Sequence, residues 1–295
     1  MKGVKKSEFK YQFCLNIVLM LFALASILPF LLLVIASFTD ENTLIQGGYT
    51  FFPTKFSINA YKYLIYQGPM IFRAYGITFL VTFVGTSLNL ILTAMIAYPL
   101  SRKDFSKRNL FSFIVFFTML FNGGLVPSYL MWTQFFHIKN TIFALIFPNL
   151  LMNAFGVILM KNYFSSNVPH ELIEAAEIDG AGEFTTFFRV VLPLSLPILA
   201  TVGLMSAISY WNDWTNGLYY LTDQRLFSLQ NVLNRILTDL QFLSSSTVSS
   251  QIHMDMPSTG IRMAIAVIGV VPILVLYPFF QKYFVKGITM GAVKG

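Results

Sequence analysis

The side chains that could do chemistry in this sequence are few, and most lie outside its apolar runs. The three histidines, His137, His170 and His253, are isolated, and no second histidine or cysteine stands at metal-ligand spacing from them. The glycine-rich loop ending in Lys and Ser or Thr that usually binds ATP phosphates does not occur. The sequence therefore predicts no catalytic residue, no metal site and no cofactor site in this chain.

A cluster of carboxylates occupies residues 161–192, a stretch that separates two apolar runs. Five acidic residues lie there, the densest acidic cluster in the chain: Glu171, Glu174, Glu177, Asp179 and Glu183. Pro169 fits the start of a helix, where its missing N–H does no harm, and Gly180-Ala181-Gly182 supplies glycines that accept the left-handed conformation at a helix end. The pattern predicts one helix between these points and a second short helix from Glu183 towards Pro193.

This pair of helices has an acidic face and an apolar stripe, and the stripe has two possible partners. Leu172, Ile173, Ala175 and Ala176 recur at helical spacing. The stripe would rest on the lipid surface or dock in a protein groove. Helices at a lipid surface usually carry Lys and Arg, because anionic headgroups repel carboxylates. The acidic face therefore favours a protein groove.

The composition indicates that lipid is the main solvent of the chain. Of its 295 residues, 56% are hydrophobic and 11% are charged, against roughly 25% charged in an average soluble domain. A single cysteine, Cys14, excludes an internal disulfide. Runs of about 20 apolar residues are long enough to cross a bilayer. Residues 1–295 are thus expected to form one all-α membrane domain with six transmembrane helices, at about 14–38, 77–100, 110–132, 141–160, 193–210 and 263–280.

The distribution of basic residues predicts the orientation of these helices. With the N-terminus in the cytoplasm, thirteen Lys and Arg residues lie in cytoplasmic segments and seven lie outside. Both termini and the segments 101–109, 161–192 and 281–295 are then cytoplasmic, and the long loop 211–260 is external. The same bias accounts for the net charge of +7 without a nucleic-acid partner.

The predicted spans contain no Asp, Glu, Lys, Arg or His. Transporters that are driven by protons or ions usually carry such groups at membrane depth. A stand-alone channel or a membrane-embedded enzyme would need pore-lining charges or a catalytic cluster there. The absence of charge argues against both, and indicates transport that is driven by a partner or runs downhill.

Several motifs resemble the permease subunits of ABC importers. Glu174-Ala175-Ala176, Gly180, Val190 and Leu192-Pro193 have the spacing of the EAA loop of that family, with Val190 where Ile is commoner. The tail, Gln281–Gly287 and Gly291–Gly295, is similar to that of the smaller permease of the maltose type. Phe121–Pro127 resembles the polysaccharide-type, LplC-like branch. The similarity covers nearly the whole chain.

The resemblance implies a type I ABC importer permease fold with a cytoplasmic coupling helix that docks in a cleft of the ATPase. By position, the coupling residues would be Glu174, Ala175, Ala176, Asp179, Gly180, Leu192 and Pro193. The chain would form half of a pore for oligosaccharides or polysaccharide fragments in the bacterial cell membrane. Its partners would be a second permease, an extracellular sugar-binding protein or lipoprotein, and two ATPase subunits that bind ATP and Mg. A permease for a non-sugar solute would share the EAA loop and remains the alternative.

Amides and aromatic residues near the spans are candidates for a sugar path, because aromatic faces and amide side chains commonly bind sugars. One group follows the fifth span: Tyr210, Trp211, Asn212 and Trp214. An interfacial aromatic belt has the same composition, so both interpretations stay open. Asn122, Asn149 and Asn153 lie within spans, where an amide is costly in lipid and turns towards a helix partner or a cavity.

Two further stretches are longer than connectors require. In the loop 211–260, leucine and isoleucine repeat at helical spacing and predict an amphipathic helix, which would be an interfacial cap or a docking surface for the external binding protein: Leu226, Leu229, Leu233, Ile236, Leu237 and Leu240. Residues 244–250 are polar and expected to be mobile. The basic tail after Phe280 would touch anionic lipid or, by the resemblance, reach towards the ATPase dimer interface.

Overall fold

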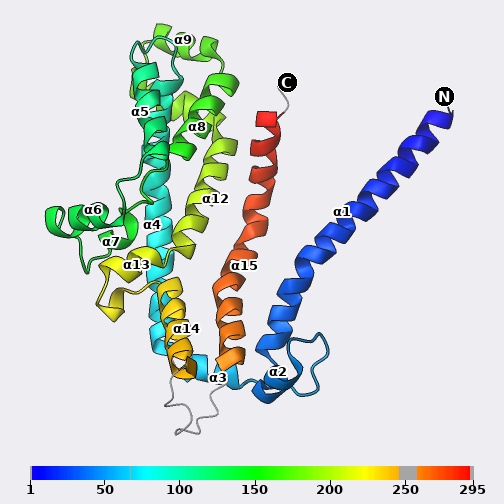
Figure 1. Ribbon diagram of the computed structural model, residues 1–295. Coiled ribbons are helices and arrows are strands. Elements are labelled where there is room, and N and C mark those ends of the chain that lie inside the picture. Colours follow the sequence, from blue (N-terminus) through cyan, green and yellow to red (C-terminus); the bar gives the residue numbers. More distant parts are fainter. Residues whose placement is uncertain (1, 67, 246–257, 293–295) are drawn as a thin grey trace. The chain divides into compact units, whose positions relative to one another are not determined.

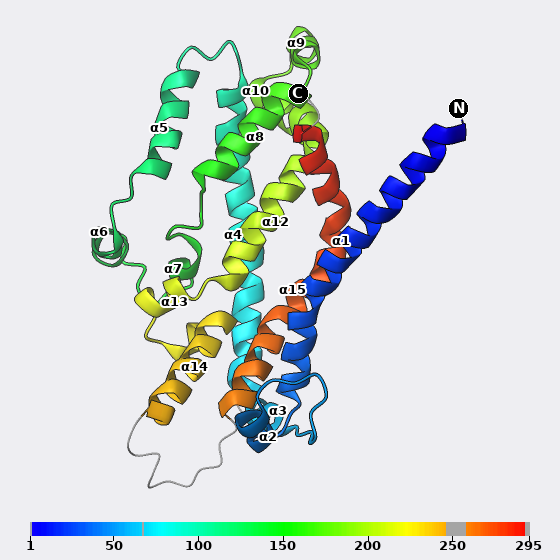
Figure 2. The same ribbon diagram turned by 45° about the vertical axis from the view of Figure 1, so that its right-hand side comes forward.

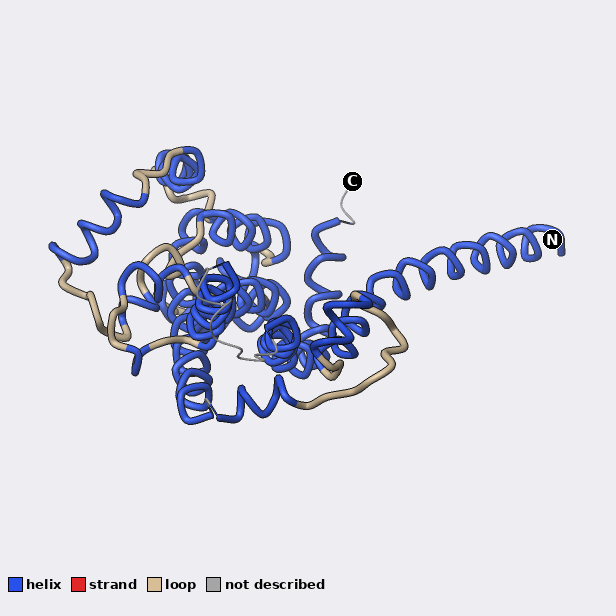
Figure 3. The backbone as a smooth tube through the Cα atoms, turned by 60° about the horizontal axis from the view of Figure 1, so that its bottom comes forward, coloured by secondary structure: helices blue, strands red, loops and turns tan. Residues whose placement is uncertain are grey.

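The computed structural model describes residues 2–66, 68–245 and 258–292 (Figure 1). In these ranges the chain consists of helices joined by loops, as the composition predicts, and a single bridge between Thr39 and Phe56 is the only β-type pairing (Figure 3). The chain divides into two compact units, one from Met1–Pro69 with Ile236–Val271 and the other from Met70–Arg235 with Pro272–Gly295.

The first unit holds α1 (Lys2–Ser37), α2 (Glu41–Gly47) and α3 (Asn59–Tyr66), together with the beginning of α15 (Ser258–Ala292). The first backbone N–H groups of a helix lack partners within the helix. At the start of α15 the Glu41 carboxylate accepts hydrogen bonds from the N–H groups of Thr259 and Gly260, each 2.9 Å long. A side chain from α2 therefore caps a helix that begins more than 200 residues later in the sequence.

The second unit is built around α4 (Gly68–Ser101), which both views show running alongside α12 and α8 (Figures 1 and 2). Its core joins small residues of α4, such as Ala94 and Ala97, to Val157 and Met160 of α8 and to Val202 of α12. The other helices of this unit are α5 (Arg108–Leu120), α6 (Leu125–Leu130), η1 (Met131–Phe135), α7 (Phe143–Ile146), α8 (Ala154–Asn167), α9 (His170–Ile178), α10 (Glu183–Thr186), η2 (Phe187–Val191), α11 (Leu192–Leu194), α12 (Leu196–Asn212), α13 (Thr215–Tyr220) and η3 (Gln224–Leu226).

The sequence predicts one transmembrane helix for each of six apolar runs, and the structure divides some of these runs between two or more helices. Among the described residues, Tyr11–Ser37 and Gly68–Ser101 are single helices long and apolar enough to cross a membrane. Two bent pairs raise the number to at most four if each pair is one span: Arg108–Leu120 with Leu125–Phe135, bent by 112°, and Glu183–Leu194 with Leu196–Asn212, bent by 83°. The run 141–160 is divided between α7 and α8, and 263–280 lies within α15.

The described parts of the loop 211–260 and of the tail after Phe280 are largely helical. The leucine repeat falls in α14 (Leu229–Ser245), where Leu229, Leu233 and Leu240 are buried, while Leu226 belongs to η3. Of the stretch 244–250, residues 246–250 lie outside the described residues. The backbone of the tail continues as α15 to Ala292, and residues 293–295 also lie outside the description.

Close packing of α4 against α12 requires a glycine at position 85. A Cβ atom added to Gly85 would lie 2.6 Å from Cε1 of the Tyr210 ring, which is nearly fully buried. No comparable contact exists at Gly76 on the same helix, where a Cβ would meet nothing within 4 Å. The aromatic ring of α12 therefore occupies the space that any other residue would need at position 85.

We predict that Gly85→Ala destabilises the folded protein and Gly76→Ala does not. Overpacking a filled site typically costs about 1–3 kcal/mol, whereas alanine in an open helical position is favourable by about 1 kcal/mol over glycine. The melting temperature of each variant in detergent would be measured by size-exclusion chromatography after heating. Equal melting temperatures for the two would contradict this account of the α4–α12 contact.

Candidate functional site

The segment 161–192, called the coupling loop below, contains the helix–turn–helix that the sequence predicts. Helix α9 begins directly after Pro169, and α10 begins at Glu183. Between them Gly180 has φ +81°, the left-handed conformation expected at that position. The turn is closed by hydrogen bonds from Gly180 N–H to the Glu177 carbonyl (3.0 Å) and from Ala181 N–H to the Ala176 carbonyl (2.9 Å).

The exposed face of α9 carries the predicted anchoring carboxylate. The Glu174 side chain is 62% exposed, and its Oε1 lies 3.2 Å from His170 Nδ1, one turn earlier. Ala175 beside it is exposed, whereas Ile173 is buried in the core of the unit. The apolar stripe is therefore divided, with one side facing the protein interior and the other facing outward. The remaining predicted coupling residues vary in exposure: Ala176 and Leu192 are half-buried, and Asp179, Gly180 and Pro193 are exposed.

The inner side of the coupling loop is held by a group that the sequence analysis missed. Arg102 follows the last residue of α4, and its side chain is only 9% exposed. Its guanidinium donates two hydrogen bonds to Asp104 (2.8 and 2.7 Å) and one to Glu177 of α9 (2.7 Å). It also donates to the Tyr98 hydroxyl (3.2 Å), which in turn donates to Glu183 of α10 (2.9 Å). We call these five residues the Arg102 network.

The charges of this network stabilise one another. Hydrogen bonding to Arg102 holds the pKa of Asp104 below its usual value, although burial opposes the shift. The pKa of Arg102 is raised, chiefly by its hydrogen bonds to Asp104, so that the guanidinium stays charged despite its burial. Glu177 is 45% exposed, as its place in the acidic cluster leads one to expect, but it is also an ion-pair partner of the buried Arg102.

Residues 146–153, from the last residue of α7 to the residue before α8, are called the unwound segment and interrupt the predicted span 141–160 about halfway along α4. Backbone carbonyls in such a segment must find partners within the protein where water is absent. Three side chains supply them: the Tyr210 hydroxyl donates to the Ile146 carbonyl (2.8 Å), and the Asn216 amide to the Pro148 carbonyl (3.0 Å). The Asn89 amide donates to the carbonyls of Leu150 (3.0 Å) and Leu151 (3.2 Å). The break is thus stabilised by side chains from α4, α12 and α13.

A polar cavity of about 90 Å³ lies beside the unwound segment, between α4, α8 and α12. Asn149 and Asn153 reach its wall from the segment itself, and the Asn153 side chain also caps α8 by accepting from Phe155 N–H (2.8 Å). Two hydroxyls in the wall, those of Thr93 and Ser206, are buried without a hydrogen-bond partner in the structure. The cavity is lined by Asn89, Thr93, Asn149, Leu150, Asn153, Phe155, Gly156, Val202, Met205, Ser206 and Ser209.

Of the seven predicted pathway residues, Asn149 and Asn153 line the polar cavity, and the other five do not. Tyr210 and Trp211 are buried, and Trp211 packs edge-on against Phe79 of α4. The Asn212 amide donates back to the Ile208 carbonyl of its own helix (3.0 Å). Asn122 is exposed and accepts from Gly124 N–H (2.8 Å), and Trp214 is partly exposed without lining the cavity.

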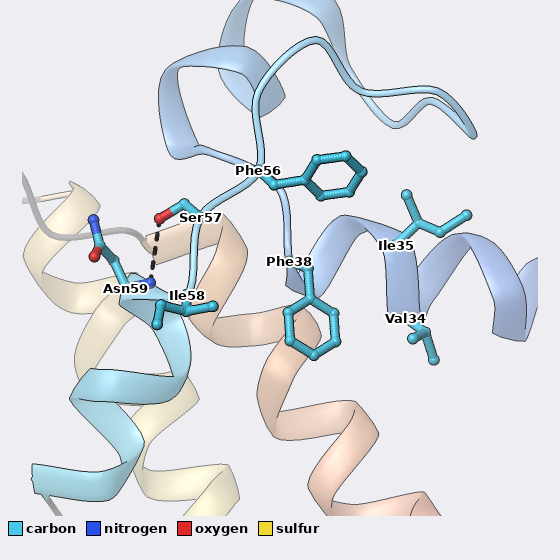
Figure 4. Close-up of a pocket in the computed structure, with 7 residues that line it drawn as sticks. All are labelled: Val34, Ile35, Phe38, Phe56, Ser57, Ile58 and Asn59. Atoms are coloured by element: carbon cyan, nitrogen blue, oxygen red, sulfur yellow. Dashed lines mark hydrogen bonds between the residues drawn. The ribbon is translucent and has the colours of Figure 1, made fainter.

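A second cavity, in the first unit, has a different character (Figure 4). It has a volume of about 540 Å³ and lies between the end of α1 and the segment before α3. Its walls are mainly apolar, and its one drawn hydrogen bond joins Asn59 N–H to the Ser57 hydroxyl (3.2 Å). This surface offers few groups to a hydroxyl-rich molecule. Its lining residues are Val34, Ile35, Phe38, Phe56, Ser57, Ile58 and Asn59.

Comparison with known proteins identifies the family. Residues 89–290, which include the coupling loop and the polar cavity, match the family described as "Binding-protein-dependent transport system inner membrane component". The chain belongs to this family. It is a membrane permease of a transport system, not an enzyme, and it has the helical permease fold that the EAA motif predicts.

Individual relatives agree with this assignment. The permease is 40% identical to protein LplC of Bacillus subtilis over 272 residues, covering 92% of this chain and 90% of that protein. It is 37% identical to the polygalacturonan/rhamnogalacturonan transport permease YtcP of the same organism, covering 94% and 96%. It also superposes on a chain of a bacterial ABC transporter involved in the import of the acidic polysaccharide alginate, with a TM-score of 0.78, 29% identity and coverage of 94% and 98%.

The sequence contains a signal for some of the residues that the analysis missed. Asn89 lies in an apolar run, and the criterion that selected Asn149 and Asn153 would have selected it too. Threonine and serine are common in spanning helices, so nothing in the sequence distinguishes Thr93 and Ser206. Arg102 looks like an ordinary cytoplasmic cation that follows a span, and only the fold shows that it is buried against the coupling loop of the permease.

Proposed function

We propose that the permease forms half of the pore of an ATP-driven importer for oligosaccharides or polysaccharide fragments. A second permease would form the other half, two cytoplasmic ATPase subunits would bind ATP and Mg, and an extracellular sugar-binding protein or lipoprotein would deliver the substrate. The names of the relatives support this substrate class, since YtcP and the alginate transporter both act on polysaccharides. The observation that carries the proposal is the outward-facing half of α9, in the same unit as an uncharged polar cavity.

The coupling role of α9 follows from what it leaves exposed. Glu174 is available to a basic group of an ATPase, because its neighbour His170 is itself half-exposed and does not enclose it. Ala175 lets a partner backbone approach closely, and the apolar side chains of Leu172 (45% exposed) and Ile178 (86%) would lose contact with water in a groove. The buried Ile173 fixes the helix to its own unit, so that a force applied to the exposed side moves the unit.

We predict that Glu174→Lys and Gly180→Val abolish uptake and ATPase association while both variants still insert in the membrane. The first places a cation opposite the expected basic partner, at a cost of about 1 kcal/mol if exposed and several if the pair is desolvated. The second forces a β-branched residue to φ +81°, which moves α10 relative to α9, although the position has free space for the side chain. Co-purification of the ATPase and uptake of labelled oligosaccharide would measure the effects.

The matched control is Glu171→Lys, because Glu171 is an exposed carboxylate on the first turn of the same helix. Glu177, although it lies on the same helix, is unsuitable since it bonds to Arg102. Glu171→Lys is expected to keep most of the activity. Wild-type uptake and ATPase binding in both Glu174→Lys and Gly180→Val would reject the coupling role and favour a helix that rests on lipid.

The polar cavity suits a hydroxyl-rich solute and not an ion. Its wall has three asparagines, a threonine and two serines, and no charged side chain. An amino acid or a phosphate would require charged partners, which are also absent from the predicted spans. With about 90 Å³, the cavity is smaller than a typical ligand pocket. It would therefore be one wall of a sugar path that a second permease completes.

We predict that Thr93→Val lowers uptake about fivefold at subsaturating sugar without lowering stability. The hydroxyl has no partner in the structure, so its loss costs the folded protein nothing, whereas one lost hydrogen bond to a sugar is worth about 1 kcal/mol. Thr82→Val is the control, because Thr82 also has an unpartnered buried hydroxyl on α4 but does not line the cavity. If uptake by Thr93→Val equals that of Thr82→Val, the cavity is not on the path.

The orientation is proposed from the basic-residue count, with both termini in the cytoplasm. The contact between Arg102 and Glu177 supports one part of it, since the segments 101–109 and 161–192 lie at the same end of α4. In a Cys14→Ala background, we predict that Glu171→Cys reacts with a membrane-impermeant thiol reagent only after permeabilisation. Tyr49→Cys is predicted to react in intact cells, because Tyr49 is exposed and lies between the first two predicted spans, in the segment that the same count places outside. The reverse labelling pattern would overturn the orientation.

A further inference from the structure

The Arg102 network joins α4 to both arms of the coupling loop. Through Glu177 it holds the end of α9, and through Tyr98 and Glu183 it holds the start of α10. A second, longer approach joins Arg102 Nη2 to Glu183 Oε1 at 3.7 Å. The two arms meet at Gly180, so the network bonds to the chain three residues before and three residues after the turn. The turn therefore cannot change its position relative to α4 without breaking at least one of these bonds.

The Arg102 network favours one fixed arrangement of its five residues. A buried guanidinium is costly unless its donors are paired, and removing one partner leaves an uncompensated charge. Arg102 satisfies this need with a bidentate bond to Asp104, which lies on its own segment, and with single bonds to Glu177 and Tyr98. The planar fork of arginine can direct its donors to three groups at once, which the ammonium of lysine does not reproduce.

The chain that leaves the coupling loop at its C-terminal end is poorly suited to transmit a displacement, whereas the chain that enters the loop is the single helix α8. After α10 the chain forms the π-helix η2, and at Ser195 the helix axis bends by 83° before α12 begins. In contrast, α4 is one helix over its whole length (Figure 2). From Arg102 back to Asn89, 13 residues along this segment, the distance is about 20 Å at 1.5 Å per residue. Asn89 and Thr93 of α4 both line the polar cavity.

We propose that Arg102 is the positioning residue through which movement of the coupling loop is passed to α4, and along α4 to the polar cavity. This inference rests on the proposed function, because it assumes that α9 is moved by an ATPase. The network makes α9, α10 and the end of α4 one mechanical body. Without it, the loop would remain attached to the rest of the unit through α8, through the bent connection at Ser195 and through buried core residues such as Ile173.

The proposal separates transmission from assembly, and this gives the test. In the complete importer reconstituted in liposomes, Arg102→Gln should still bind the ATPase and hydrolyse ATP, because the exposed face of α9 is unchanged. Uptake should fall at least tenfold, so that far more ATP is consumed for each sugar imported. Arg102→Lys should be intermediate, since it keeps the charge but not the geometry. Lys103→Gln, an exposed neighbouring cation, is the control and should transport normally.

Two further variants interrupt the network one arm at a time and leave Arg102 in place. Glu177→Gln weakens the bond to α9. Tyr98→Phe removes the hydroxyl bridge to α10 while keeping the aromatic ring, and leaves the longer Arg102–Glu183 approach of 3.7 Å. Each should raise the ATP consumed per sugar, and the double variant should approach Arg102→Gln. These variants decide the question if Arg102→Gln fails to assemble: normal uptake in both would then show that Arg102 serves folding alone. The control for the carboxylate is Glu171→Gln.

A distance measurement tests the mechanical claim directly. Spin labels at Ser106 and Glu171, both exposed, would report the position of α9 relative to the loop that follows α4 in a Cys14→Ala background. One narrow distance distribution is expected in both the nucleotide-free and the ATP-trapped importer, and a broad one in Arg102→Gln. A distance that changes on ATP trapping in the wild-type importer would overturn the proposal.

The outcomes distinguish this inference from the function on which it rests. Wild-type uptake in Arg102→Gln together with loss of uptake in Glu174→Lys would reject the role of Arg102 and keep the coupling role of α9. Uptake and ATP hydrolysis that fall in equal proportion would also reject transmission, because the energetic yield would be unchanged. Wild-type behaviour of both Arg102→Gln and Glu174→Lys would reject both.

Discussion

Backbone groups that lie where water is absent must be satisfied by the protein itself, and this constraint explains the form of the second unit. A continuous helix satisfies it locally, as α4 does. The unwound segment does not, and its carbonyls depend on donors from three other places in the fold: Tyr210, Asn216 and Asn89. Each of these side chains is nearly fully buried. The break in the predicted span is thus possible only because α4, α12 and α13 place hydrogen-bond donors next to these carbonyls.

The same break creates the polar cavity. Had residues 141–160 formed one helix, the amides of Asn149 and Asn153 would have pointed in directions set by the helical period. In the observed arrangement Asn149 has φ +62° and Asn153 caps α8, and both lie in one wall with Thr93 and Ser206. A non-helical backbone at membrane depth is tolerated where it lines such a cavity. The departure from regular structure and the candidate site are therefore one feature.

A feature that depends on residues close together in the sequence can be predicted from the sequence, whereas one that depends on the pairing of distant residues cannot. The helix–turn–helix of the coupling loop is local, because Pro169 and Gly180 define its boundaries within a dozen residues, and it was predicted correctly. The Arg102–Glu177 bond joins residues 75 apart, and Asn89 reaches Leu150 across 61. Neither hydrophobic periodicity nor the spacing of motifs indicates that these distant residues pair. For the same reason the broken spans were expected to be continuous: hydropathy measures the apolar character of residues 110–132 or 141–160, and not the donors that allow them to unwind.

Charge is distributed along the second unit in a way that separates its two tasks. The polar cavity contains only neutral groups, so a solute bound there would be held by hydrogen bonds that are easily exchanged. The ionised groups of the Arg102 network stand at the end of α4, beyond the apolar run, where the cost of burying a guanidinium is offset by three carboxylates and a hydroxyl. Under the proposed function, strong and directional bonds stand where a rigid connection is needed, and weaker ones line the proposed sugar path. Because α4 connects the two, the stiffness of this helix determines how much of a movement at Glu177 reaches Thr93.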